Sequence, residues 1–124
     1  MDDVIPPAVR EFITRHIDTV SELEALLILR AHPKESWTLD QLANRVYVSR
    51  RGISEIIERF AAEGFVKRED DRYRYDCKDA TLEETIAELA RRYASHLIPV
   101  TNMIHSKPRS IRSFSDAFKL RKDK

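Results

Sequence analysis

The chain has 124 residues, of which 42% are hydrophobic and 35% charged, a composition typical of one globular, water-soluble domain rather than a disordered chain. It contains no apolar run near the roughly 20 residues of a membrane-spanning helix, and its acidic N-terminus lacks the apolar core of a secretion signal. Because the single cysteine, Cys77, cannot form an internal disulfide, we expect a cytoplasmic protein.

The formal net charge of +1 is unevenly distributed along the chain. Residues 1–36 carry four basic and seven acidic side chains, residues 37–76 carry eight of each, and residues 77–124 carry ten and six. Most of the basic excess lies from His105 onward. The average charge therefore neither indicates nor excludes a nucleic-acid partner, and the local pattern has to decide.

The first 20 residues are expected to form an N-terminal helix. Pro6 and Pro7 suit its beginning, where a missing backbone N–H costs little. Its apolar positions recur at the helical period on one face, which either contributes to the core or contacts a second copy of the chain. These positions are Val9, Phe12, Ile13 and Ile17.

A second helix is expected to begin at Ser21, which forms a capping box with Glu24. The residues that follow are apolar on nearly all sides of the helix, and this predicts a buried central helix. His32 and Pro33 end it.

Two further helices follow, with only a short turn between them. Thr38 and Gln41 form another capping box, and the helix that they begin ends near Tyr47. Ser49 is the N-cap of the next helix, and Gly64 is the residue at which that helix stops. The two apolar faces are Leu39, Leu42, Ala43 and Val46 in the first helix, and Ile53, Ile56, Ile57, Phe60 and Ala61 in the second.

Residues 65–69 and 72–75 are short alternating runs around Asp70 and Asp71, and this pattern predicts a β-hairpin. Basic and aromatic residues alternate on its second strand and therefore lie on opposite faces. We expect the tyrosines to pack against the domain and the arginines to face outward. These residues are Tyr73 and Tyr75, and Arg72 and Arg74.

The helix pair and hairpin resemble the winged helix-turn-helix of small bacterial transcriptional regulators of the MarR/ArsR-like group. The resemblance lies in WTLDQLANRV (37–46) and in the stretch from VSRR (48–51) to EGFV (63–66), and it covers about residues 21–76. It implies an α+β, mostly α fold in which the second helix of the pair enters the major groove of double-stranded DNA. It also allows a small-molecule effector between this domain and the helix that follows.

The polar face of the second helix supplies candidate DNA contacts. Arg51 has the geometry to contact guanine with two hydrogen bonds, Glu55 to accept one from a cytosine amine, and Ser54 to contact several bases. Basic residues around them and on the hairpin are expected to hold phosphates. The predicted DNA-contacting residues are Arg45, Ser49, Arg50, Arg51, Ser54, Glu55, Arg59, Lys67, Arg68, Arg72 and Arg74.

A solvated face is the alternative interpretation of the same helix. Arg51, Glu55 and Arg59 are spaced by four residues, so they suit a surface ladder of ion pairs. Glu55 and Glu58 would also repel phosphate. The equal numbers of acidic and basic residues in 37–76 keep open a second function, a winged-helix module that binds a protein instead of DNA.

Residues 77–124 are expected to begin with a long helix that is capped by Thr81 together with Glu84. Apolar residues spaced by threes and fours form a seam, which either makes a homodimer or packs back on the N-terminal helices. Pro99 should kink or divide the helix. The residues of the seam are Leu82, Ile86, Leu89, Tyr93, Leu97, Val100 and Ile104.

The C-terminal segment after Pro108 combines apolar and basic residues. Ser110 can cap a final amphipathic helix with Phe114 and Phe118 on its apolar face. Such a segment suits docking on the rest of the protein, and it also suits DNA backbone, an anionic membrane or a partner protein.

Motifs for catalysis, metal or cofactor binding are absent from the sequence. Gly52 and Gly64 are the only glycines, so there is no glycine-rich phosphate loop, and the four histidines form no i, i+4 pair. A lone Cys77 is more consistent with a structural role than with a redox switch. We therefore expect no enzyme, metal or cofactor, and a sequence-specific DNA-binding regulator that acts as a homodimer.

Overall fold

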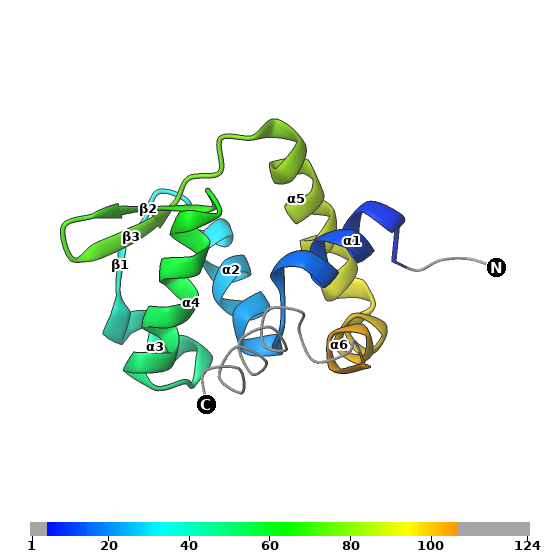
Figure 1. Ribbon diagram of the computed structural model, residues 1–124, viewed down its shortest axis with the longest axis horizontal. Helices are drawn as coiled ribbons and strands as arrows, with labels where there is room; N and C mark the ends of the chain where they lie inside the picture. Colours follow the sequence, from blue (N-terminus) through cyan, green and yellow to red (C-terminus); the bar gives the residue numbers. More distant parts are fainter. Residues whose placement is uncertain (1–4, 107–124) are drawn as a thin grey trace, which may run out of the picture.

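The computed structural model describes residues 5–106, and the predicted final helix from Ser110 lies outside that range. The described part is mostly helical with one small antiparallel sheet, so the α+β, mostly α prediction is confirmed (Figure 1). Its elements are α1 (Pro7–His16), α2 (Val20–Ala31), β1 (Trp37–Thr38), α3 (Leu39–Val46), α4 (Arg50–Ala62), β2 (Val66–Glu69), β3 (Arg72–Tyr75), α5 (Ala80–Ser95) and α6 (Leu97–Ser106).

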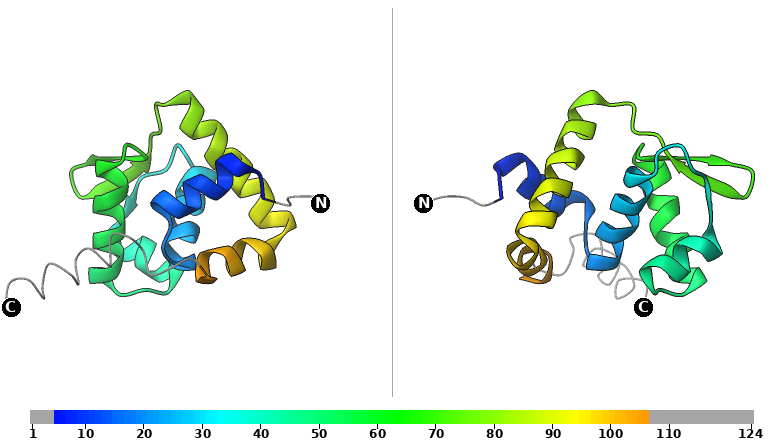
Figure 2. Two further views of the ribbon diagram at one scale, coloured as in Figure 1. Left: turned by 45° about the vertical axis from the view of Figure 1, so that its right-hand side comes forward. Right: turned by 180° about the vertical axis from the view of Figure 1, so that it is seen from behind.

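Helix α2 lies in the middle of the molecule, with α1, α5 and α6 on one side and α3, α4 and the sheet on the other (Figures 1 and 2). Its buried residues include Leu23, Leu26 and Leu29, as expected for a central helix. Helix α1 buries Val9, Phe12 and Ile13 and packs on α5. The apolar face of α1 therefore belongs to the chain's own core.

The start of α2 differs from the prediction. Its N-cap is Thr19, whose Oγ1 accepts from the Glu22 N–H at 3.1 Å, and not Ser21. Glu22 in turn accepts the Asp18 N–H at 2.7 Å. The sequence contains two overlapping cap patterns, Thr19 to Glu22 and Ser21 to Glu24, and the earlier one begins the helix.

Both predicted caps around the α3–α4 turn are confirmed. Thr38 and Gln41 exchange hydrogen bonds of 3.1 and 2.9 Å in a capping box, and Ser49 Oγ accepts from the Gly52 N–H at 2.9 Å. The isoleucine stripe of α4 and Phe60 are buried. Gly64 has φ +88°, a left-handed conformation that suits glycine at the end of a helix.

The hairpin of β2 and β3 forms as predicted, with Asp70 at φ +59° in its turn. Tyr73 and Tyr75 are buried, so their packing against the domain is confirmed. Strand β1, which is only two residues long, was not predicted. It joins the far side of β3, giving the order β1-β3-β2, with Trp37 opposite Tyr73.

The C-terminal part of the described chain contains two helices instead of one long helix. Helix α5 is capped by Asp79, whose Oδ1 accepts from the N–H groups of Thr81 and Leu82, so the cap predicted at Thr81 is wrong. Helix α6 turns away from α5 (Figure 2). Pro99 explains the division, because in a continuous helix its ring would clash with the carbonyl of Ser95, four residues earlier.

None of the helices in residues 5–106 combines the length and the apolar character that crossing a membrane requires.

Candidate nucleic-acid interface

The outer face of α4 carries two strongly exposed side chains of the predicted DNA-contacting set. The side chain of Arg51 is 90% exposed and that of Glu55 is 73% exposed, with Arg51 Nε 3.7 Å from Glu55 Oε2. Ser54 is half-buried beside them. The Arg51–Glu55 ion pair of the solvated-face interpretation is therefore present, although an exposed pair of this kind contributes only a few tenths of a kcal/mol.

The first turns of α3 and α4 are linked by an ion pair. Arg50 Nη1 donates to Asp40 Oδ1 at 2.8 Å, and both side chains are exposed. Arg45 lies over the ring of Trp37, with 5.5 Å from its guanidinium carbon to the ring centroid. The hydroxyl of Ser49 is used as the helix cap.

The hairpin presents four basic side chains, of which three arginines are held by nearby acceptors. Arg68 Nε donates to the carbonyl of Asp70 at 2.8 Å. Arg74 Nη2 donates to Glu69 Oε2 at 2.9 Å, and Arg72 Nη1 donates to the carbonyl of Ser36 at 3.3 Å. Lys67 is exposed on β2. A phosphate can replace such solvent-exposed partners at little energetic cost.

The outward position predicted for Arg59 is wrong. Its Nη2 donates to Glu22 Oε1 at 2.7 Å and to the carbonyl of His16 at 3.2 Å. The side chains of Arg59 and Glu22 are only 21% and 9% exposed. The turn between α1 and α2 covers this part of α4, so Arg59 joins the three helices and is not available to DNA. Glu22 is one of two glutamates in α2, so the sequence alone did not identify it as the partner of Arg59.

Tyr47 is the surface residue that the sequence did not assign to the site. It is the C-cap of α3, with φ +59° and ψ +46°, and it is 92% exposed. A left-handed conformation costs a residue other than glycine roughly 1–2 kcal/mol. The sequence predicted that α3 ends near Tyr47, but it predicted neither the left-handed conformation of Tyr47 nor the exposure of its side chain.

The residues of the predicted dimer seam are divided between the core and the surface. Ile86, Leu89, Val100 and Ile104 are buried in the chain's own core. Leu82 and Tyr93 are half-buried, and the Tyr93 hydroxyl donates to Glu24 of α2 at 2.9 Å. Burial and the Glu24 carboxylate raise the pKa of Tyr93 to about 12. Leu97 is 50% exposed, and beside it Ile98 is 62% exposed.

An open cleft of about 390 Å³ lies where β3, the chain after it, α2 and α5 meet. Arg30 Nη2 is 2.9 Å from Glu83 Oε2, and the Tyr75 hydroxyl donates to the same carboxylate. Burial and Glu83 raise the pKa of Tyr75, so its hydroxyl remains a donor. Burial also raises the pKa of the Cys77 thiol at the rim, which disfavours the reactive thiolate.

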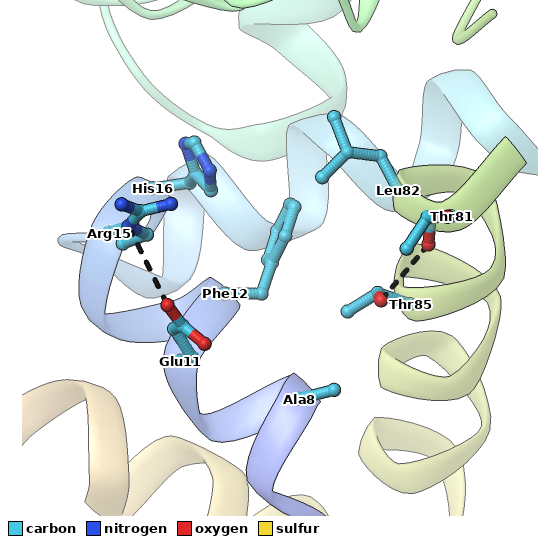
Figure 3. A pocket seen from close by; sticks show the side chains of 8 residues that line it. All are labelled: Ala8, Glu11, Phe12, Arg15, His16, Thr81, Leu82 and Thr85. Atoms are coloured by element: carbon cyan, nitrogen blue, oxygen red, sulfur yellow. Dashed lines mark hydrogen bonds and ion pairs between the residues drawn. The ribbon is translucent and has the colours of Figure 1, made fainter. Parts of the chain in front are cut away.

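A second, smaller depression of about 210 Å³ lies between α1 and α5 (Figure 3). Phe12 and Leu82 form its apolar part. Glu11 and Arg15 lie at one side, with 3.9 Å between Arg15 Nε and Glu11 Oε2. Among residues 5–106 no group of three or more acidic, histidine or cysteine side chains is placed to hold a metal ion.

Ten of the eleven predicted DNA-contacting residues fall into two groups, one around the α3–α4 turn and along α4 and one on the hairpin, and Arg59 belongs to neither. Both groups lie in the half of the molecule that α3, α4 and the sheet form (Figure 1). Comparison of the sequence with known family models and with curated proteins finds no match. The function therefore has to be argued from the fold and these side chains.

Proposed function

We propose that this protein is a sequence-specific DNA-binding transcriptional regulator built on a winged helix-turn-helix. In this proposal α3 and α4 are the helix pair, α4 enters the major groove, and the β2–β3 hairpin is the wing. The observation that carries it is the two-sided character of α4. Its isoleucines are buried, while Arg51 and Glu55 stand exposed near its N-terminal end, and a projecting basic hairpin follows its C-terminal end.

Arg51 and Glu55 would contact base edges. The exposed Arg51–Glu55 pair separates at little cost, because water already solvates both charges. Arg51 is then free to donate two hydrogen bonds to guanine and Glu55 to accept from a cytosine amine, with Ser54 between them in the sequence. Both glutamates of this face, Glu55 and Glu58, would disfavour non-specific contact with phosphate and so increase discrimination between sequences.

Phosphate contacts would come from the basic residues on either side of α4. Arg50 would exchange Asp40 for a phosphate, and Arg74 would exchange Glu69 in the same way. Such contacts hold the helix in register without distinguishing bases. The remaining members of this group are Arg45, Lys67, Arg68 and Arg72.

Replacing Arg51 with alanine should weaken binding to the preferred site by roughly 1–3 kcal/mol and relax the preference at one base pair. The measurement is a titration of the selected site and its single-base variants with both proteins. Arg91→Ala is the matched control, because Arg91 is an exposed, ion-paired arginine on α5, away from α4. An unchanged base preference in Arg51→Ala would remove Arg51 from the base-contacting role.

A homodimer is part of the proposal, because two-fold symmetric binding to two half-sites is the usual arrangement for this class of domain. Since four of the seam residues are buried within the chain, the interface would use the exposed Leu97 and Ile98 at the start of α6. The solution mass should be twice the 14.5 kDa of one chain, and a Leu97→Ser/Ile98→Ser variant should be monomeric. A wild-type monomer at micromolar concentration would contradict this arrangement.

A small-molecule effector, if the regulator has one, would bind in the 390 Å³ cleft, where the Arg30–Glu83 pair and the Tyr75 hydroxyl supply polar groups.

A second candidate function is a protein-interaction module. It is favoured by the ion pairs Arg50–Asp40, Arg51–Glu55 and Arg74–Glu69, which neutralise much of the basic charge on this side of the molecule. Absence of DNA binding at low salt, together with capture of a protein partner through the same face, would favour this function.

A further inference from the structure

Tyr47 occupies the turn between α3 and α4 in a way that the fold itself does not require. The turn is closed by backbone hydrogen bonds, in which the N–H groups of Tyr47 and Val48 both donate to the carbonyl of Ala43. Glycine or asparagine at position 47 would make the same bonds and adopt the left-handed conformation with less strain. The tyrosine side chain is therefore not needed to form the turn.

The side chain of Tyr47 is also not held in place by polar or ring contacts with the described part of the chain. Within residues 5–106 its hydroxyl makes no hydrogen bond and its ring no aromatic or cationic contact, and 92% of the residue is exposed. Among residues 5–106 the other exposed large apolar residues, Leu97 and Ile98, lie on α6 and are less exposed than Tyr47. Tyrosine combines a rigid ring with a hydroxyl donor and is enriched where proteins contact their partners.

The surroundings of Tyr47 favour an anionic partner. Arg45 precedes it by two residues, and the N-cap Ser49 and the first α4 residue, Arg50, follow it by two and three residues. The first turn of α4 contains no acidic residue, so the positive end of the helix dipole is not offset there. DNA phosphate fits this combination better than an acidic or apolar protein surface, because tyrosine hydroxyls and helix N-termini both commonly contact the DNA backbone.

We propose that Tyr47 donates its hydroxyl to a DNA phosphate at the edge of the groove that α4 enters, and that this contact sets how deeply the helix sits. The inference rests on the proposed DNA-binding function. In this proposal the strained backbone of Tyr47 is retained because the hydroxyl is needed at that position. A substitution that relieves the strain should therefore raise the stability of the fold and lower the affinity for DNA.

The test compares Tyr47→Gly, Tyr47→Phe and Arg51→Ala with the wild type by thermal unfolding and by titration of a selected duplex at several salt concentrations. Tyr47→Gly should unfold at an equal or higher temperature than the wild type and bind DNA about tenfold or more weakly. Tyr47→Phe, which keeps the ring and the backbone strain, should leave the unfolding temperature unchanged and still bind about tenfold more weakly. Because a neutral hydroxyl displaces no counterion, the salt dependence of both variants should match that of the wild type.

The outcomes separate this inference from the proposed function. Wild-type binding that Arg51→Ala weakens but Tyr47→Gly and Tyr47→Phe leave intact would overturn the Tyr47 contact alone. No binding by the wild type would overturn both. A protein partner that binds the wild type and is lost in Tyr47→Gly, without any DNA binding, would also overturn the phosphate contact and assign Tyr47 to a protein interface.

Discussion

Replacing Phe65 with alanine is expected to lower the free energy of unfolding by about 4 kcal/mol, because it opens a large cavity in the core. Phe65 directly precedes β2 and is fully buried against α1 and α4. Its ring centroid lies 5.5 Å from that of Phe12 in α1, 5.2 Å from His16 and 5.7 Å from Phe60 in α4. The residue begins the hairpin, so its loss would loosen the hairpin, α4 and α1 together. Urea unfolding measures the change.

Phe65→Leu is the control for this prediction. Leucine keeps most of the buried volume and removes only the aromatic contacts, so we expect a loss of less than about 2 kcal/mol. If Phe65→Ala were no less stable than Phe65→Leu, the aromatic cluster around Phe65 would not be the junction between α1, α4 and the hairpin.

Replacing Arg59 with alanine is expected to destabilise the fold by about 3 kcal/mol, since it leaves the carboxylate of Glu22 buried without its charged partner. The carbonyl of His16 loses a donor in the same substitution. Once folded, Arg59→Ala should bind DNA as well as the wild type, because the side chain lies under the α1–α2 turn. Chemical unfolding and DNA titration at a temperature where the variant is folded test the two statements.

Arg51→Ala provides the opposite pattern on the same helix. Its side chain is solvated, so the free energy of unfolding should change by less than about 0.5 kcal/mol while DNA binding weakens.

A double variant, Glu22→Met with Arg59→Met, should recover much of the stability lost in Arg59→Ala, because apolar side chains of similar volume can replace a buried ion pair. Equal stability of Arg59→Ala and Arg51→Ala would contradict the buried position of Arg59.

The sequence was sufficient to predict the elements that carry strong local signals. The caps at Thr38 and Ser49, the stop at Gly64 and the turn at Asp70 each have a local chemical cause, and the structure contains all four. The apolar stripe of α4 is long enough to determine which of its faces is buried.

The errors arose where two local patterns competed or where tertiary contacts decided the outcome. Thr19 and Asp79 each precede a residue that was a plausible cap, and the pattern alone could not rank them. The inward position of Arg59 depends on the α1–α2 turn, which is distant in the sequence and invisible in a helical wheel of α4. The two residues of β1 are too few to show alternation.

The apolar seam of the C-terminal helices is a second case in which tertiary contacts decided what the sequence pattern could not. Regular spacing predicted an apolar face but not what would cover it. Pro99 divides the helix, and α1 packs on α5, so Ile86 and Leu89 reach the chain's own core. Within α5 and α6, the large apolar side chains that stay exposed are Leu97 and Ile98 at the start of α6.

The most direct measurement is fluorescence anisotropy of a pool of random DNA duplexes, titrated with the wild type and with an Arg50→Ala/Arg51→Ala variant across a range of salt concentrations. We predict that the wild type binds, that its affinity falls steeply as salt increases, and that the variant binds more weakly with a shallower salt dependence. No binding by the wild type at low salt, or equal binding by both proteins, would contradict a DNA-binding role for α4.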